Sequence, residues 1–163
     1  MNEPKVVEEK APETPIQSAD YSLSAGRTEY EAAVAKQDPI ARRPLLQKAG
    51  AHFQAAIHAN PDALEAYGWL SQTYRMLAAV MRTDQPDLAD LFTRFACAAA
   101  WEGSSRASSP AATPIRVKQE VRTLIAWLRA TRHVAATDAE AAMQTLRDQC
   151  LEGALSSPPD EAA

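Results

Sequence analysis

The chain has 163 residues, a length that suits one domain or one compact repeat array, and 46% of them are hydrophobic. A formal net charge of −4 argues against a protein that coats nucleic acid with its whole surface, while a local basic patch stays open. Common helix formers, only 5 glycines and no run of alternating β-branched residues favour helices over strands and predict an all-α fold.

Low-complexity segments divide the chain into parts. Proline and glutamate are frequent in residues 1–19, which we expect to be a disordered tail, and residues 156–163 have the same character. Residues 102–113, rich in serine and alanine, are predicted to link the helical region 20–101 to a C-terminal helical hairpin at 114–155.

Caps and prolines mark the helices between these segments. We predict six of them, over roughly 20–36, 45–59, 60–81, 86–101, 114–133 and 137–153. Asp20 is expected to cap the first, and Pro44 is expected to delay the start of the second. Asn60 and Pro61 form a cap followed by a first-turn proline, and Thr137 opens a capping box. Short connections predict three antiparallel pairs.

Small and large side chains alternate at helical spacing around the second and third predicted helices. The small residues are Ala49, Ala56 and Ser71, and the large ones are Phe53, Tyr67, Leu70 and Tyr74. Small side chains let two helices approach closely, and large ones fill the space between them. With Pro61 at the junction, the stretch Ala49–Tyr74 resembles the tetratricopeptide repeat (TPR) family. The resemblance implies a short solenoid of stacked helical hairpins.

The repeat length departs from that of the family. Phe53 and Phe95 are 42 residues apart, which exceeds the roughly 34 residues of a TPR unit. We therefore expect longer hairpins or longer loops than in a standard array. The third pair keeps the hairpin but lacks the motif, so it is either a diverged repeat or a cap. Its apolar stripes are expected to pack on the preceding pair, with an oligomer seam as the alternative.

The resemblance also implies a binding surface, because TPR proteins bind peptides on the concave face formed by the first helix of each pair. The implied partner-binding residues are Thr28, Glu31, Glu65, Gln72 and Arg75. Family members that grip C-terminal carboxylates have an asparagine where this chain has Trp69, so that specificity is not expected. Trp69 and Trp101 are expected in the core, with a groove position as the alternative.

The fifth predicted helix carries a basic stripe. Lys118, Arg122, Arg129 and Arg132 lie within about 80° of one another on a helical wheel. One interpretation is a surface that binds anions or nucleic acid. The other is a solvated face, partly neutralised by Glu140, Asp148 and Glu152 of the sixth helix.

No pattern in the sequence indicates catalysis, a cofactor or a metal site. His52 and His58 point to different sides of one helix, and the scattered glycines form no phosphate loop. Cys97 and Cys150 are expected to be reduced thiols, although a disulfide between them stays open. A charged start and the absence of a long apolar run predict a cytoplasmic protein without a membrane span.

These observations favour a protein–protein interaction adaptor or scaffold that binds a peptide or protein segment on a TPR-like helical surface, and disfavour an enzyme. A self-associating structural subunit or secretion-type chaperone is the first alternative. An adaptor for nucleic acid or an anionic surface, acting through the basic stripe of residues 115–133, is the second.

Overall fold

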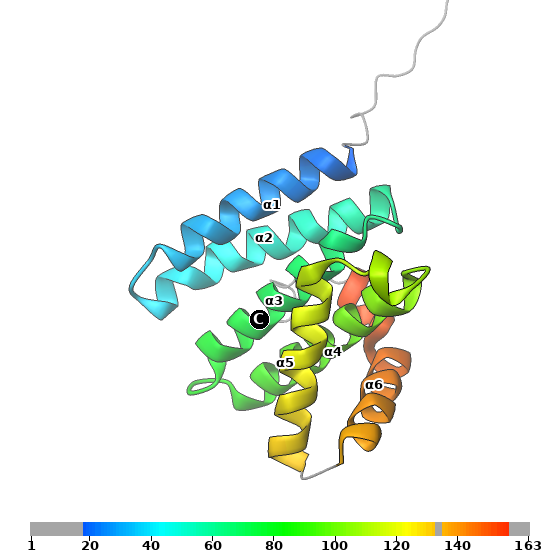
Figure 1. Ribbon diagram of the computed structural model, residues 1–163. Coiled ribbons are helices and arrows are strands. Elements are labelled where there is room, and N and C mark those ends of the chain that lie inside the picture. Colours follow the sequence, from blue (N-terminus) through cyan, green and yellow to red (C-terminus); the bar gives the residue numbers. More distant parts are fainter. Residues whose placement is uncertain (1–17, 133–134, 157–163) are drawn as a thin grey trace, which may run out of the picture.

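The computed structural model describes residues 18–132 and 135–156, and in these ranges the protein is all-α, as predicted (Figure 1). Six α-helices and one short 3-10 helix account for most of them. They are α1 (Ala19–Val34), α2 (Pro39–Ala59), α3 (Leu64–Met81), α4 (Pro86–Arg106), η2 (Pro110–Ala112), α5 (Ile115–Arg132) and α6 (Ala136–Ser156). The predicted tails lie outside the described residues, except that Ser18 and Ala19 start α1 and Ser156 ends α6.

Two helix starts differ from the predicted ones because Asp20 and Asn60 do not cap the helices that follow them. The hydroxyl of Ser18 accepts a hydrogen bond from the Tyr21 amide at 3.1 Å, so Asp20 lies inside the first turn of α1. Asn60 ends α2 instead of starting α3, and its side-chain oxygen accepts from the Asp62 amide at 3.0 Å in a local turn.

The second helix begins earlier than expected, because Pro44 lies inside α2 rather than before it. Asp38 caps the helix by accepting a hydrogen bond from the Ile40 amide at 3.0 Å, and Pro39 occupies the first helical position. Pro44 removes only the backbone bond to Ile40, whose side chain is 70% exposed near the helix start. The loss at this exposed end leaves the helix continuous.

The segment expected to be a linker is partly helical. Helix α4 continues to Arg106, and after three intervening residues η2 forms at Pro110. The extension is stabilised because Glu102, inside it, accepts hydrogen bonds from Arg106 one turn later and from Arg147 of α6. At the other end of the hairpin, α6 begins at Ala136, so Thr137 lies within its first turn instead of capping it.

The core lies where the TPR-like pattern placed it. All seven residues of the pattern are fully buried: Ala49, Phe53, Ala56, Tyr67, Leu70, Ser71 and Tyr74. Helices α1 and α2 form one antiparallel hairpin, and α3 and α4 form the next, with α2 packed on α3. The prediction of stacked hairpins with these side chains between them is confirmed for these four helices.

The third hairpin is splayed. Helix α5 packs on both α3 and α4, whereas α6 packs on α4 more extensively than on its own partner α5. Figure 1 shows α5 crossing the α3–α4 hairpin while α6 runs along another side of α4. The close approach of α5 to α3 depends on Gly68, where a Cβ atom would lie 3.0 Å from the backbone nitrogen of Val117. The apolar stripes of this hairpin pack inward, since most of their side chains are buried: Val117, Leu124, Leu128, Ala139, Met143 and Leu146.

Candidate functional site

The two α3 residues predicted to bind a partner, Gln72 and Arg75, make contacts inside the molecule instead. The side chain of Gln72 donates to the Tyr30 hydroxyl of α1 at 2.8 Å and accepts a hydrogen bond from Arg116 of α5. Arg75 is half-buried and forms a bidentate ion pair with Glu120 of α5. Both side chains join α3 to neighbouring helices, so we do not carry them forward as binding residues.

The ion pair between Arg75 and Glu120 is the centre of a buried polar cluster. The carboxylate of Glu120, only 4% exposed, accepts from Arg75 Nε at 2.7 Å and from Arg75 Nη2 at 2.6 Å. The Ser71 hydroxyl lies 2.9 Å from the same carboxylate. These contacts raise the pKa of Arg75 despite its partial burial. The cluster attaches α5 to α3.

The other predicted partner-binding residues remain on the surface. Glu31 and Glu65 are exposed, and their side chains form no hydrogen bond or ion pair with any residue in the described ranges. Thr28 is exposed, and its hydroxyl donates to the Ser24 carbonyl of its own helix at 3.1 Å. The structure brings none of these three side chains into a shared polar cluster with Gln72 or Arg75.

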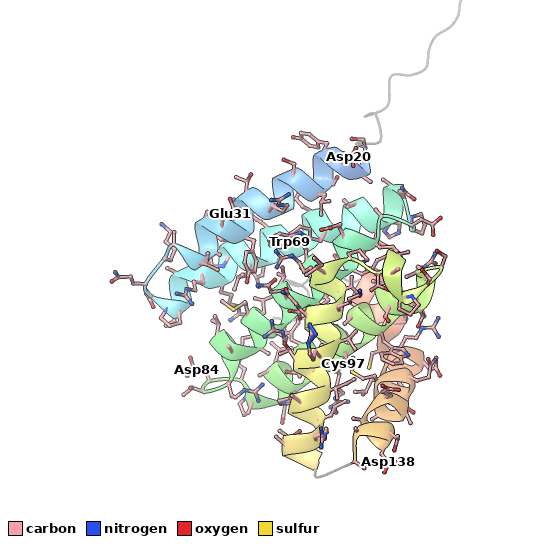
Figure 2. The ribbon with its side chains drawn as sticks, in the orientation of Figure 1. Asp20, Glu31, Trp69, Asp84, Cys97 and Asp138 are labelled. Carbon is pink, nitrogen blue, oxygen red and sulfur yellow. The ribbon has the colours of Figure 1, made fainter. Side chains whose placement is uncertain are left out.

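Trp69 and Trp101, expected in the core with a groove position as the alternative, both contact residues of neighbouring helices. Trp69, labelled in Figure 2, is 7% exposed and stacks on Phe53 with ring centroids 5.7 Å apart. The guanidinium carbon of Arg116 lies 3.6 Å from its ring centroid. Trp101 is half-buried, and its indole nitrogen donates to Gln144 of α6 at 2.7 Å. Both side chains are packing residues.

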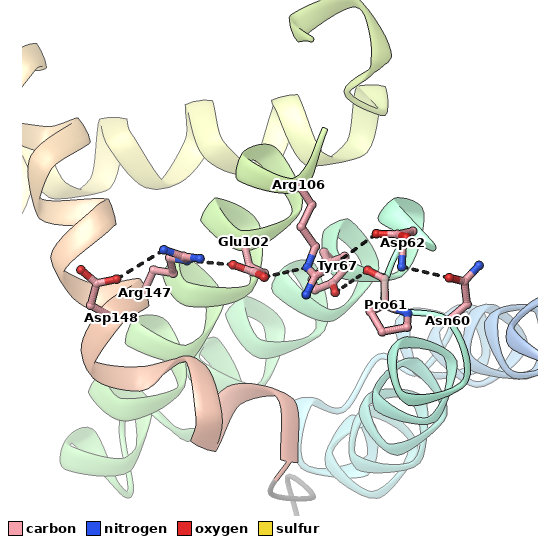
Figure 3. A network of polar contacts seen from close by, with 8 residues as sticks. All are labelled: Asn60, Pro61, Asp62, Tyr67, Glu102, Arg106, Arg147 and Asp148. Atoms are coloured by element: carbon pink, nitrogen blue, oxygen red, sulfur yellow. Dashed lines mark hydrogen bonds and ion pairs between the residues drawn. The ribbon is translucent and has the colours of Figure 1, made fainter. Parts of the chain in front are cut away.

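A second buried carboxylate belongs to Glu102, at the centre of the network in Figure 3. It accepts from Arg106 Nε at 2.7 Å and from Arg147 Nε of α6 at 2.8 Å. Arg106 also lies 3.3 Å from Asp62, in the turn before α3. Nearby, the Tyr67 hydroxyl donates to the Pro61 carbonyl, and burial raises the pKa of Tyr67 to about 12. This network holds α6, α4 and the turn together.

The basic stripe of α5 has a different environment. Lys118, Arg122 and Arg129 are exposed, and none forms an ion pair with another residue in the described part of the chain. The side chain of Arg132 lies outside the described positions.

The acidic residues of α6 that were weighed as neutralising partners do not pair with this stripe. Asp148 lies 3.4 Å from Arg147 of its own helix. Glu140 and Glu152 are exposed and make no ion pair with any described residue. The positive charges of Lys118, Arg122 and Arg129 are therefore not neutralised by contact with an acidic side chain of the described residues.

A groove runs beside this stripe, between the end of α4, the segment 107–114 and α5. Its volume is about 520 Å³, and it is open to solvent. Three kinds of group line it. The apolar ones are Ala107, Pro110, Val121 and Ile125; the hydroxyls are Ser104, Ser108, Ser109 and Thr113; the cations are Lys118 and Arg122. We call this feature the α4–α5 groove.

The outer wall of the groove is the segment 107–114, most of which was predicted to be a linker. Local hydrogen bonds hold this segment in place. The Ser109 hydroxyl accepts from the Ala112 amide at 3.3 Å, and the Thr113 hydroxyl donates to the Ser109 carbonyl at 3.2 Å. Pro110 at the first position of η2 presets the backbone for this turn. The signal missed in the sequence was Ser109-Pro110, a helix cap followed by a first-turn proline.

Chemistry-bearing residues do not converge elsewhere in the described structure. No three histidine, cysteine, aspartate or glutamate residues within it are placed to hold a metal ion. Cys97 is buried, burial raises the pKa of Cys150, and no disulfide joins these two described residues. No described helix is long and apolar enough to cross a membrane.

No family model matches the chain, and neither the curated proteins nor the solved structures contain a match.

Proposed function

We propose that this protein is a non-catalytic adaptor that binds a segment of a partner protein in the α4–α5 groove. The observation that carries the proposal is the groove itself, which combines apolar side chains with hydroxyls and cations on an open surface. Apolar area gives affinity, and a few polar groups orient a bound chain. The TPR-like core pattern supports the proposal, since stacked hairpins provide a rigid support for such a surface.

The form of the groove favours an extended or helical segment over an enclosed small molecule. The groove lies along α5, from Lys118 to Ile125, and is open to solvent. A chain that follows this helix can place one side chain against Val121 and Ile125 while its backbone continues in both directions. The preformed wall at 107–114 reduces the ordering cost of binding.

The proposal can be tested with a displayed library of random peptides selected on the full-length protein. Binding peptides should shift the backbone amide signals of the groove residues in nuclear magnetic resonance spectra. Ser108→Trp should abolish binding, because Ser108 is exposed in the groove and an indole there fills it. Ser105→Trp is the matched control, since Ser105 is exposed on α4 outside the groove lining. Peptides that bind Ser108→Trp unchanged would contradict the proposal.

A second candidate function is an adaptor for nucleic acid or an anionic surface, favoured by the unpaired cations of α5. Lys118 and Arg129 are eleven residues apart, so these charges extend over about 16 Å of one helix face. Binding of duplex DNA that weakens steeply with added salt and is lost in Arg129→Glu would favour this function. Self-association, the other alternative expected from the sequence, is tested by light scattering of the protein over a concentration series.

A further inference from the structure

We infer that the occupant of the α4–α5 groove is an acidic peptide segment of a partner protein, in which carboxylates flank an apolar side chain. This inference rests on the proposed function and adds the chemistry of the partner. It follows from the charge of the groove, from the spacing of its cations and from the groups that lie between and opposite them.

The charge of the groove is positive. Lys118 and Arg122 are its charged lining residues, and none of the described lining residues is acidic. The nearest acids in sequence are Glu120 and Glu102, which are respectively one and two residues from a lining residue. Glu120 is buried and paired with Arg75, and Glu102 is buried and paired with Arg106 and Arg147. A carboxylate that enters the groove therefore meets unpaired cations and no acidic side chain among the lining residues.

The spacing of the cations matches alternate residues of an extended chain. Lys118 and Arg122 are four residues apart, so they follow one another along α5 by about 6 Å. Side chains on one face of an extended peptide repeat at about 7 Å. Two carboxylates separated by one residue can therefore reach both cations at once. Arg129, about 10 Å beyond Arg122 on the same face, is placed for a further carboxylate.

The groups around the cations suit the rest of such a segment. Ile125 falls on the same face of α5, between Arg122 and Arg129, and is half-buried, so it presents apolar surface between charges. On the opposite wall, the hydroxyls of Ser104 and Ser108 make no hydrogen bond with any described residue. They are donors for the carboxylates or backbone carbonyls of a bound segment.

The test measures fluorescence anisotropy of labelled peptides with the full-length protein. The probe peptide has glutamates and one leucine at alternate positions, Glu-Ser-Glu-Ser-Leu-Ser-Glu, so that all four side chains lie on one face of an extended chain. Comparison peptides carry lysines for the glutamates or alanine for the leucine. The glutamate–leucine peptide should bind, and both comparison peptides should bind at least about tenfold more weakly. The double variant Lys118→Glu with Arg122→Glu should reduce affinity by more than about tenfold, and added salt should weaken binding. The double variant Lys36→Glu with Lys48→Glu, which makes the same change in net charge at two exposed positions away from the groove, is the matched control.

The outcomes separate this inference from the proposed function. If the lysine peptide binds as well as the glutamate one, or the double charge reversal has no effect, the acidic partner is wrong. Loss of binding in Ser108→Trp would then still support the groove as the binding site. If Ser108→Trp leaves every peptide bound, the proposed function itself fails. If duplex DNA or anionic vesicles displace the peptide when they are added at an equal concentration of negative charges, the surface recognises polyanions in general. That outcome overturns the inference.

Discussion

Helix α5 has two charged faces, and they differ in what their charges contact. The inner face carries Glu120, which is almost completely buried and is bonded to Arg75 and Ser71 of α3. The groove face carries Lys118 and Arg122, which are exposed and have no ionic partner within the described residues. The two faces are separated by only two residues in sequence.

The difference shows that residue type alone does not separate structural from binding charges. Arg75 and Arg122 are both arginines on amphipathic helices, yet one neutralises a buried carboxylate and the other reaches water. Removal of a charge whose partner is buried leaves that partner desolvated and unpaired, which lowers stability. A charge without such a partner can be changed at little cost and is available for another molecule.

Removal of the inner ion pair should give the largest loss of stability. Arg75→Ala leaves the carboxylate of Glu120 buried without its guanidinium, so the free energy of unfolding should fall by about 3 kcal/mol. Denaturant unfolding followed by circular dichroism measures the change. The double variant Arg75→Met with Glu120→Leu should be less destabilised than Arg75→Ala alone, because no charge stays buried. Equal losses in the two variants would show that the ion pair is not what stabilises this contact.

The close backbone contact between α3 and α5 at Gly68 should give the next largest effect. Gly68→Ala places a Cβ atom 3.0 Å from the Val117 nitrogen, so α5 must move away from α3, at a cost of about 2 kcal/mol. The matched control is Gly153→Ala in α6, where the nearest atoms belong to the Phe95 side chain at 3.1 Å and can move. If Gly68→Ala were as stable as the control in thermal unfolding, the close packing of α5 on α3 would be contradicted.

The second buried carboxylate should be less costly to neutralise. Glu102→Gln removes a charge whose partners, Arg106 and Arg147, are 38% and 29% exposed. These arginines can be hydrated after the change, and the amide keeps a hydrogen-bond acceptor, so the loss should be about 1 kcal/mol. Chemical denaturation of Glu102→Gln and Arg75→Ala, measured side by side, tests the predicted order of the two stability losses. A loss larger than that of Arg75→Ala would mean that partner exposure does not control these costs.

The sequence predicts much of this fold because the helices are specified locally. Capping residues, prolines and apolar spacing gave the number and the approximate bounds of the helices, and the pattern from Ala49 to Tyr74 gave the core. The predicted bounds were wrong where a contact between residues far apart in the chain determines where a helix ends. Helix α4 continues past Trp101 because Glu102 bonds to Arg147, 45 residues away, and no local signal contains that contact.

The site was less predictable for the same reason. The stripe of Lys118 and Arg122 could be found from helical periodicity, and the wheel also places Glu120 on the opposite side. The role of Arg75 could not be found, because its contact with Glu120 depends on how α5 crosses α3. The α4–α5 groove depends on that crossing and on the folded segment 107–114, which composition alone assigned to a linker.

The smallest expected effect on stability is also the most informative about function. The double variant Lys118→Ala with Arg122→Ala removes two exposed charges without internal partners, so the free energy of unfolding should change by less than about 0.5 kcal/mol. The same variant should lose most of its affinity for the glutamate–leucine peptide, measured by anisotropy. Stability and binding would then be separated on the two faces of one helix. A loss of stability close to that of Arg75→Ala would instead place these cations in the structural network, and the distinction between the faces of α5 would be wrong.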